Sequence, residues 1–151
     1  IFIHDETYIR SNKESSTIVN GIHGNPLNTS LYVKNCLSTS AVIVKKELLI
    51  KYGGFDERLM SSQDYDLWLK LSPYLMLYKI NDILGEYHET GNSITAKFYF
   101  HRVFDQLLIA YRYKSYVAIH QYYFKVFKIL FSKQWFYGLK NIFFGDKSHN
   151  Y

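Results

Sequence analysis

The stretch GGFDE at residues 53–57, followed by SSQDYDLWLKL at residues 61–71, decides how this chain is expected to fold. It places a glycine pair and several carboxylates between two segments with helical periodicity. Residues 45–52 carry their leucines and a tyrosine on one face, and Gly53 follows where a left-handed helix end favours a residue without a Cβ atom. The pattern predicts a short helix over residues 45–52, a loop, and a second helix capped by a serine.

The second helix should bury one face and present acidic groups elsewhere. Leu67, Trp68 and Leu71 follow the i, i+3, i+4 spacing of an apolar face. Asp64 and Asp66 are two positions apart, which separates them by roughly 200° on a helix with about 3.6 residues per turn. The two carboxylates therefore cannot share a proton or hold one ion together, and they must have different roles.

Asp66 and Asp64 can be interpreted from their local spacing. Asp66 is placed to pair with Lys70 at i, i+4 on the solvated side, so we expect a structural role and little effect of Asp66→Asn. Ser61 and Asp64 fit a capping box, which would make Asp64 a helix cap. The helix dipole also favours an ionised carboxylate in the first turn, which is the state that a general base needs. Spacing alone leaves both roles of Asp64 open.

Four motifs occur in order and together resemble the family 2 glycosyltransferases. They are NCLSTSAVIVK at residues 35–45, GGFDE at 53–57, the acidic helix at 61–71, and LGEYHETGNSIT at 84–95, with a predicted strand between the last two at residues 76–81. The family shows TSAVIVRR, GGFDE and EDYDLWLRL segments. The resemblance implies a Rossmann-like α/β domain of the GT-A type and inverting transfer of a nucleotide-activated sugar. Asp64 would be the catalytic base.

The resemblance also implies substrate-binding positions, which are Asp56, Glu57, Gln63, Trp68 and His88. Asp56 and Glu57 would border the acceptor, and Trp68 would support the helix from below. Gln63 stands where the family usually has Glu, which removes a charge but keeps the proton acceptor at Asp64. His88 stands where the family often has Arg. It could donate a hydrogen bond to a diphosphate or acceptor, or contact a metal, and a satisfied loop histidine is an equally good interpretation.

The nucleotide-binding half of the family is not recognisable in this chain. The family holds its nucleotide and a divalent metal, Mg²⁺ or Mn²⁺, with an N-terminal half ending in Asp-x-Asp, and the only such pattern here is the helical one at residues 64–66. The chain begins with Ile1 in a predicted strand. We therefore expect residues 1–96 to be the acceptor-side portion of a GT-A domain, with most metal ligands outside the chain. The polar residues 4–6 alternate in direction along that strand, which predicts a solvated hairpin end rather than a metal site.

Residues 97–151 differ in composition from the first part. They hold nine Lys or Arg against two Asp or Glu, and 18 of the 28 aromatic residues. Two apolar helical stripes are predicted, with Gln121, Lys125 and Lys128 on the solvated side of the second; the stripes are Val103, Phe104, Leu107, Leu108 and Tyr111, then Ile119, Tyr123, Phe127, Leu130 and Phe131. Such an extension can pack on the domain, lie on an anionic membrane or bind nucleic acid. Nucleic acid is disfavoured because no nucleic-acid motif accompanies the charge.

Composition limits the setting. With 151 residues, 48% of them hydrophobic, the chain can form a globular core. The single cysteine, Cys36, excludes an internal disulfide and fits a reducing compartment. No apolar run is long enough for a membrane span. We expect a cytoplasmic protein that lies peripherally on the inner face of the cell membrane. By the resemblance it would transfer sugar to a saccharide or lipid-linked acceptor. The alternative is a binding or scaffolding module that keeps the fold without catalysis.

Overall fold

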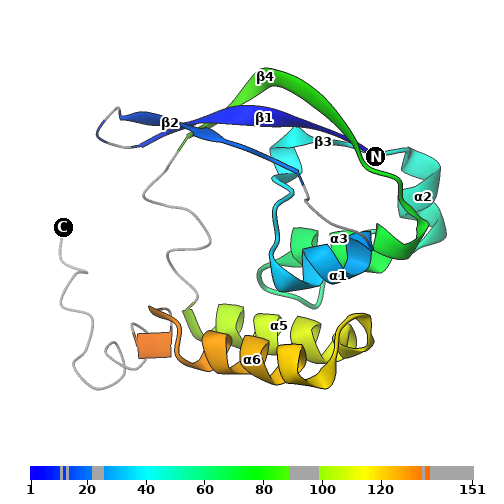
Figure 1. The fold of residues 1–151 in the computed structure, drawn as a ribbon, viewed down its shortest axis with the longest axis vertical. Coiled ribbons are helices and arrows are strands. Elements are labelled where there is room, and N and C mark those ends of the chain that lie inside the picture. Colours follow the sequence, from blue (N-terminus) through cyan, green and yellow to red (C-terminus); the bar gives the residue numbers. More distant parts are fainter. Residues whose placement is uncertain (11, 13, 22–25, 89–98, 134, 137–151) are drawn as a thin grey trace.

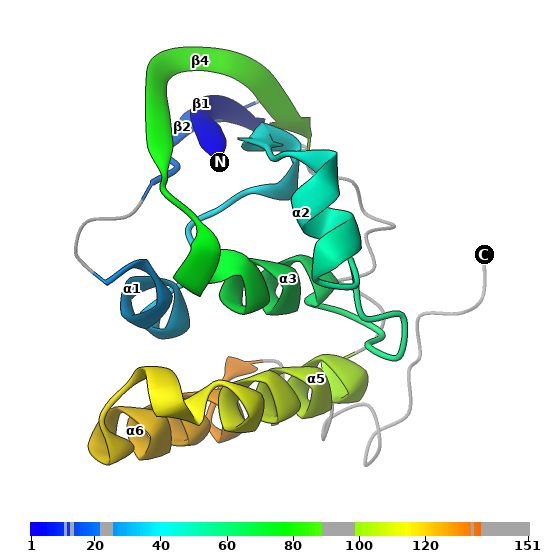
Figure 2. The ribbon, with the colours of Figure 1, turned by 90° about the vertical axis from the view of Figure 1, so that its right-hand side faces the viewer.

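The computed structural model describes residues 1–136 except 11, 13, 22–25, 89–98 and 134. In Figure 1 the chain forms three layers: a sheet at the top, short helices in the middle, and a pair of long helices below. Figure 2, turned by 90°, shows the same layers. Part of the predicted motif at residues 84–95 and the end of the basic segment lie outside the described residues. The α/β class expected from the sequence is confirmed.

The sheet is built around its first strand. Its strands are β1 (Phe2–Ile9), β2 (Ser15–Ile18), β3 (Val42–Ile43) and β4 (Tyr78–His88). β4 pairs with β1 in parallel along its whole length, while β3 and β2 pair antiparallel with the start and the end of β1. Since a strand has two edges, β2 and β3 share the edge opposite β4. The sheet is therefore mixed.

Five α-helices occur in the described residues: α1 (Leu27–Val33), α2 (Lys46–Lys51), α3 (Gln63–Leu71), α5 (Tyr99–Arg112) and α6 (Ile119–Leu130). The same residues include three short 3-10 helices: η1 (Thr39–Ala41), η2 (Ser72–Tyr74) and η3 (Lys114–Tyr116). The predicted helix at residues 45–52 and the helix after GGFDE are both confirmed. The strand expected within residues 35–45 is reduced to β3, and the strand expected at residues 76–81 begins at Tyr78 and continues to His88.

The glycine pair ends α2 as the sequence predicts. Gly53 and Gly54 have φ angles of 76° and 57°, in the left-handed region that favours glycine. The amide of Gly54 donates to the Leu49 carbonyl at 2.8 Å, which closes the helix end. The chain then turns back through the GGFDE loop. Lys70 of α3 fixes that loop by donating to the Gly54 carbonyl at 3.0 Å.

The predicted apolar face of α3 is confirmed. Leu67, Trp68 and Leu71 are all buried, and the hydrophobic core continues from them to β1, α1 and α5. The hydroxyl of Tyr65, also on α3, donates to the carbonyls of Leu31 and Tyr32 in α1 at 3.0 and 2.8 Å. These contacts fix α3 under the sheet and set the direction of its first turn.

The long helices α5 and α6 pack on the rest of the chain through one face. Val103, Ile109 and Ala110 of α5 belong to the same core as α3. Across this interface the Tyr32 hydroxyl donates to the Ala110 carbonyl at 2.9 Å, and the Thr29 hydroxyl donates to the Tyr116 carbonyl at 2.8 Å. The basic segment thus contributes to the folded core as far as it is described.

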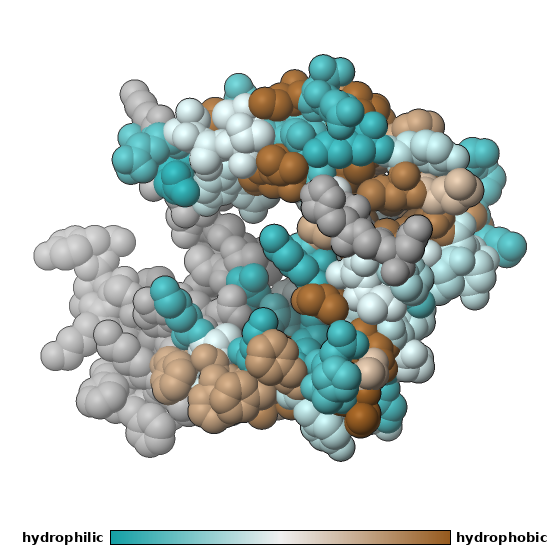
Figure 3. Space-filling model, viewed as in Figure 1, coloured by the Kyte–Doolittle hydropathy of each residue, from teal (hydrophilic) through white to brown (hydrophobic). Residues whose placement is uncertain are grey.

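The predicted orientation of the second stripe is wrong. In α6 the side that faces the molecule carries Lys125, whose ammonium group donates to the Tyr32 carbonyl and, at 2.8 Å, to the Tyr65 hydroxyl. Lys125 can face inward because the Tyr32 carbonyl and the Tyr65 hydroxyl accept hydrogen bonds from its ammonium group inside the interface. Seven members of the predicted stripes are exposed instead: Phe104, Leu108, Tyr111, Ile119, Tyr123, Phe127 and Phe131. In Figure 3 tan and brown side chains gather over this lower layer. No described helix combines the length and apolar character needed to cross a bilayer.

Candidate functional site

Asp64 lies in the first turn of α3, but the predicted capping box is wrong. Ser62 occupies the N-cap position with φ of 56° and makes no capping hydrogen bond through its side chain. Ser61 is turned away, because its amide and hydroxyl donate to one oxygen of buried Asp105 in α5, at 2.7 and 3.0 Å. Asp64 is therefore not held by a serine cap.

The Asp64 carboxylate is held by two donors from different elements. The Tyr65 amide donates to Oδ1 at 2.8 Å, and the Thr39 hydroxyl donates to Oδ2 at 2.9 Å. Thr39 begins η1, within the predicted motif at residues 35–45. The motif and the acidic helix, 25 residues apart in the chain, thus meet at this carboxylate. Asp64 remains half-buried, so it can still contact a bound molecule.

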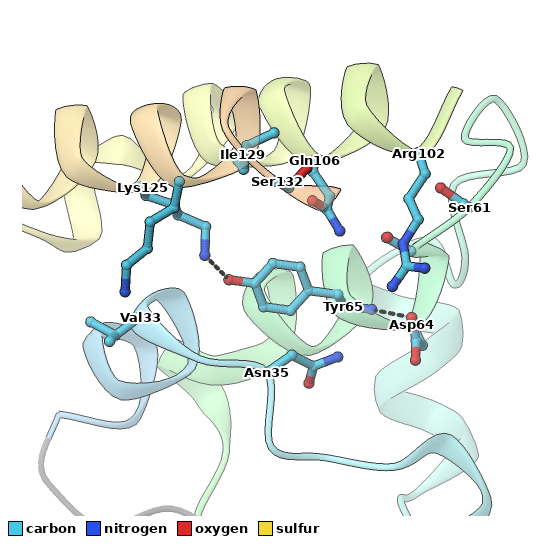
Figure 4. A pocket seen from close by; sticks show the side chains of 12 residues that line it. Val33, Asn35, Ser61, Asp64, Tyr65, Arg102, Gln106, Lys125, Ile129 and Ser132 are labelled. Carbon is cyan, nitrogen blue, oxygen red and sulfur yellow. Dashed lines mark hydrogen bonds between the residues drawn. The ribbon is translucent and has the colours of Figure 1, made fainter. Parts of the chain in front are cut away.

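Asp64 lies between two pockets and lines both. The first pocket, between α3 and the α5–α6 pair, measures about 540 Å³ (Figure 4). It is lined by Val33, Asn35, Ser61, Ser62, Asp64, Tyr65, Arg102, Gln106, Lys125, Lys128, Ile129 and Ser132. Its three cationic residues were not predicted as site residues. The i, i+3 spacing of Lys125 and Lys128 and the i, i+4 spacing of Arg102 and Gln106 are the sequence features that could have indicated a shared face.

The second pocket, of about 590 Å³, lies on the sheet side of Asp64. It is lined by Ile18, Val19, Asn20, Lys34, Asn35, Cys36, Leu37, Ser38, Thr39, Ser40, Asp64 and Tyr87. Residues 35–40, in the predicted first motif, supply half of this lining. Burial raises the pKa of the Cys36 thiol, which reduces its thiolate fraction.

A buried polar network supports the wall of the second pocket. Glu6 accepts from the Ser40 hydroxyl at 2.5 Å and from the Asn20 amide group at 3.4 Å. Burial alone would raise the Glu6 pKa, but hydrogen bonds from Ser38, Ser40 and Asn20 outweigh it and lower the pKa. Glu6 and its neighbour His4 are buried, so the predicted solvated hairpin end at residues 4–6 is wrong. The hydrogen-bond partners come from residues 14 and more positions away, which local spacing cannot indicate.

Asp66 is also placed differently from the prediction. Its side chain is 0% exposed, and its Oδ1 accepts from Arg112 of α5 at 2.5 Å and from the Tyr113 hydroxyl at 3.1 Å. Lys70 does approach, with its ammonium 4.0 Å from Oδ2. The prediction of a solvated pair between Asp66 and Lys70 is therefore wrong. Asp66 is buried, and its nearest charged partner is Arg112.

Asp56 and Glu57 lie apart from the Asp64 pockets. Both line a third pocket of about 390 Å³, together with Arg58 and Arg112. The Arg58 side chain makes two hydrogen bonds of 2.9 Å to Asp56, and Arg112 adds a third at 3.1 Å. Hydrogen bonds from these guanidinium groups hold the pKa of Asp56 well below its usual range, and Arg58 has the larger effect. Asp56 is thus engaged with two arginines.

The remaining predicted residues lie at the edges of the site or below it. Gln63 follows Ser62 directly and donates to the Leu59 carbonyl at 2.6 Å. Trp68 is 2% exposed, which fits the supporting role rather than direct contact with a substrate. His88, at the end of β4, is exposed beside Glu86 at 2.9 Å and lines neither pocket that contains Asp64. Gln63 is the chain neighbour of Asp64 but lines neither pocket that contains Asp64. Asp56, Glu57 and His88 line neither of these pockets either.

Two further observations define the site. Within the part of the chain that the structure describes, no group of three or more His, Cys, Asp or Glu side chains is arranged to hold a metal ion. No protein-family model, curated protein or solved structure matches the chain. The glycosyltransferase resemblance therefore depends on the four sequence motifs alone.

Proposed function

We propose that this chain is the acceptor-side portion of a GT-A type glycosyltransferase resembling family 2, with Asp64 as its catalytic base. The observation that carries the proposal is the position of Asp64, a half-buried carboxylate that lines two pockets at once. Sugar transfer needs such a group between donor and acceptor, because the base must reach the acceptor hydroxyl while that hydroxyl faces the anomeric carbon.

The proposed reaction uses Asp64 in one proton transfer. The acceptor oxygen attacks the anomeric carbon, the bond from that carbon to the nucleotide phosphate breaks, and the acceptor proton passes to the Asp64 carboxylate. Attack from the face opposite the leaving group would invert the configuration. Thr39 is the positioning residue, since its 2.9 Å hydrogen bond limits the rotation of the Asp64 carboxylate.

We assign the nucleotide and the metal to residues outside the described part of the chain. A divalent metal, Mg²⁺ or Mn²⁺, would stabilise the nucleotide diphosphate as it leaves. The described residues offer no cluster of side chains that could hold this metal. Gln63 supports the role of Asp64 only indirectly, through its hydrogen bond to Leu59. Asp56 and Glu57 would serve a more remote part of the acceptor, because they line a separate pocket.

We also propose that the protein works at the cytoplasmic face of a membrane. The seven exposed apolar residues named above lie on or directly after α5 and α6, and lysines accompany them. Lys114 lies over the Tyr111 ring at 3.9 Å and Lys128 over the Phe124 ring at 4.5 Å. Aromatic and basic side chains together suit an anionic membrane surface. A lipid-linked acceptor would be reached from that position.

The test is a transfer assay on the complete protein with a panel of nucleotide sugars and membrane-extracted acceptors. Asp64→Asn should lower turnover by about 10²- to 10⁴-fold and leave nucleotide-sugar affinity nearly unchanged, as expected for loss of a general base. Asp82→Asn is the matched control, because Asp82 is exposed on β4 and lines none of the three pockets. Equal turnover of the two variants would refute the proposal and favour a non-catalytic binding module.

A further inference from the structure

The first pocket contains more positive charge than its carboxylates balance. Arg102, Lys125 and Lys128 line it, and Asp64 is its only acidic lining residue. Asp105 follows Arg102 by three residues but does not line the pocket, and its Oδ2 accepts from the amide and hydroxyl of Ser61. Within the described residues none of the three cations forms an ion pair with a carboxylate.

The three cations come from two helices: Arg102 from α5, and Lys125 and Lys128 from α6. Figure 4 shows Arg102 reaching from α5 towards the start of α3, while Lys125 reaches from α6 to the Tyr65 hydroxyl. Burial, and then the neighbouring charge of Lys128, lower the pKa of Lys125 to about 8. Lys125 therefore keeps its charge at neutral pH. Three cations beside a single carboxylate repel one another, and a bound anion would lower that electrostatic cost.

The pocket also borders the exposed apolar surface. Lys128 lines the pocket and at the same time lies over the ring of exposed Phe124. One end of a bound molecule could thus meet the cations while an attached hydrocarbon chain follows α6. The neutral donors Gln106 and Asn35 line the same pocket and could hydrogen-bond further oxygens. This combination suits a doubly charged group better than a single carboxylate.

We propose that this pocket binds the phosphate ester of the acceptor, with Arg102 and Lys128 as its principal ligands. The assignment of this phosphate to the acceptor rests on the proposed function, in which Asp64, a lining residue of the same pocket, is the base. A phosphate monoester carries about −1.5 to −2 charges at pH 7, which matches the surplus of positive charge. Arg and Lys are the usual phosphate ligands of proteins. The phosphate can belong to a lipid carrier or to a soluble sugar phosphate.

Calorimetric titration of the complete protein, without any donor, tests the site. The probes are octyl phosphate, glucose 1-phosphate and neutral octyl glucoside. Arg102→Gln and Lys128→Gln should each weaken both phosphate probes about tenfold, a usual loss for one charge-assisted hydrogen bond. Lys46→Gln, on the exposed side of α2, is the control for loss of a surface charge and should change nothing. Thermal melts of the variants show that each is folded.

The probes separate the two sources of phosphate. Tighter binding of octyl phosphate than of glucose 1-phosphate indicates a lipid carrier, and the reverse order indicates a soluble sugar phosphate. Phosphate affinities unchanged in Arg102→Gln and Lys128→Gln, or octyl glucoside bound as tightly as octyl phosphate, overturn the inference. Displacement of the probe by a nucleoside diphosphate would overturn its assignment to the acceptor. Because these titrations need no transfer, they can succeed even if Asp64→Asn keeps full turnover, which would refute only the proposed function.

Discussion

Arg112, in the last turn of α5, donates to the fully buried carboxylate of Asp66 in α3, 46 residues earlier in the chain. The Tyr113 hydroxyl donates to the same Oδ1 atom, and burial, with the adjacent Asp66 charge, raises the pKa of Tyr113 so that it stays a neutral donor. This ion pair joins the basic helical pair to the helix that carries Asp64. The orientation of the candidate site therefore depends on a residue outside the recognised motifs.

Removing Arg112 should destabilise the protein strongly. Arg112→Gln removes the nearer charged partner of buried Asp66 and leaves only Lys70, 4.0 Å from Oδ2. Breaking a buried pair usually costs about 3 to 5 kcal/mol of unfolding free energy. Urea denaturation measures this change. Arg10→Gln is the control, because Arg10 and Glu14 form an exposed pair 3.9 Å apart that should contribute about 0 to 1 kcal/mol. Similar losses in the two variants would contradict a structural role of the buried pair.

Local pattern was enough to predict the elements that carry the site. Gly53 after a periodic segment marked the end of α2, and the spacing of Leu67, Trp68 and Leu71 marked the buried face of α3. These features depend on neighbours within about one helical turn, which a single sequence displays directly. For the same reason the position of Asp64 at the start of a helix could be predicted, and that position is confirmed. Its catalytic role stays a proposal.

The environment of the charged residues could not be predicted in the same way. Asp66 was expected on the solvated side because Lys70 follows at i, i+4, whereas its main partner, Arg112, is distant in the chain. Lys125 was expected opposite the apolar stripe and is instead satisfied by acceptors on α1 and α3. A polar side chain can be buried only where the fold supplies hydrogen-bond or ion-pair partners, and these can be distant in the chain. Hydrophobic periodicity therefore predicts the wrong buried face for a helix whose inner face is polar.

Thr39→Val should weaken catalysis without unfolding the protein. The substitution removes the 2.9 Å hydrogen bond to Asp64 and keeps a side chain of similar shape on an exposed turn. Loss of a hydrogen bond to a charged group predicts about a tenfold decrease in kcat with little change in KM. Thr39→Ser, which retains the hydroxyl, should recover most of the rate. Thr17→Val on exposed β2 is the matched control, and an equal effect of Thr17→Val and Thr39→Val would exclude a positioning role.

Stability should depend on pH through Lys125. Its pKa in the folded protein is about 8, lowered by burial and by Lys128 from an ordinary value of 10.5. Between these values the unfolded chain binds more protons than the folded chain, so the contribution of Lys125 to stability rises with pH. Above pH 10 the raised pKa of Tyr32, about 12, acts in the opposite direction, because tyrosine in the unfolded chain ionises first.

Urea denaturation at pH 7.5, 8.5 and 9.5 can measure this dependence. The unfolding free energy of the wild type minus that of Lys125→Met should increase across the series, since groups common to both proteins cancel. The difference between wild type and Lys46→Met, an exposed substitution on α2, should stay constant. A constant difference for Lys125→Met as well would mean that Lys125 is not desolvated in the folded protein.

The exposed face of α5 and α6 should bind anionic membranes. Flotation of the complete protein with vesicles of phosphatidylcholine and phosphatidylserine should recover more protein than phosphatidylcholine alone, and recovery should fall with added salt because screening weakens the lysine contribution. Phe127→Ser should lower the partition coefficient about tenfold, as expected when one buried aromatic side chain is lost. Ile50→Ser, at an exposed apolar position on α2, is the control. Equal recovery with both vesicle types at every salt concentration would exclude an electrostatic contribution to membrane binding. Equal effects of Phe127→Ser and Ile50→Ser would show that this face is not the membrane-binding surface.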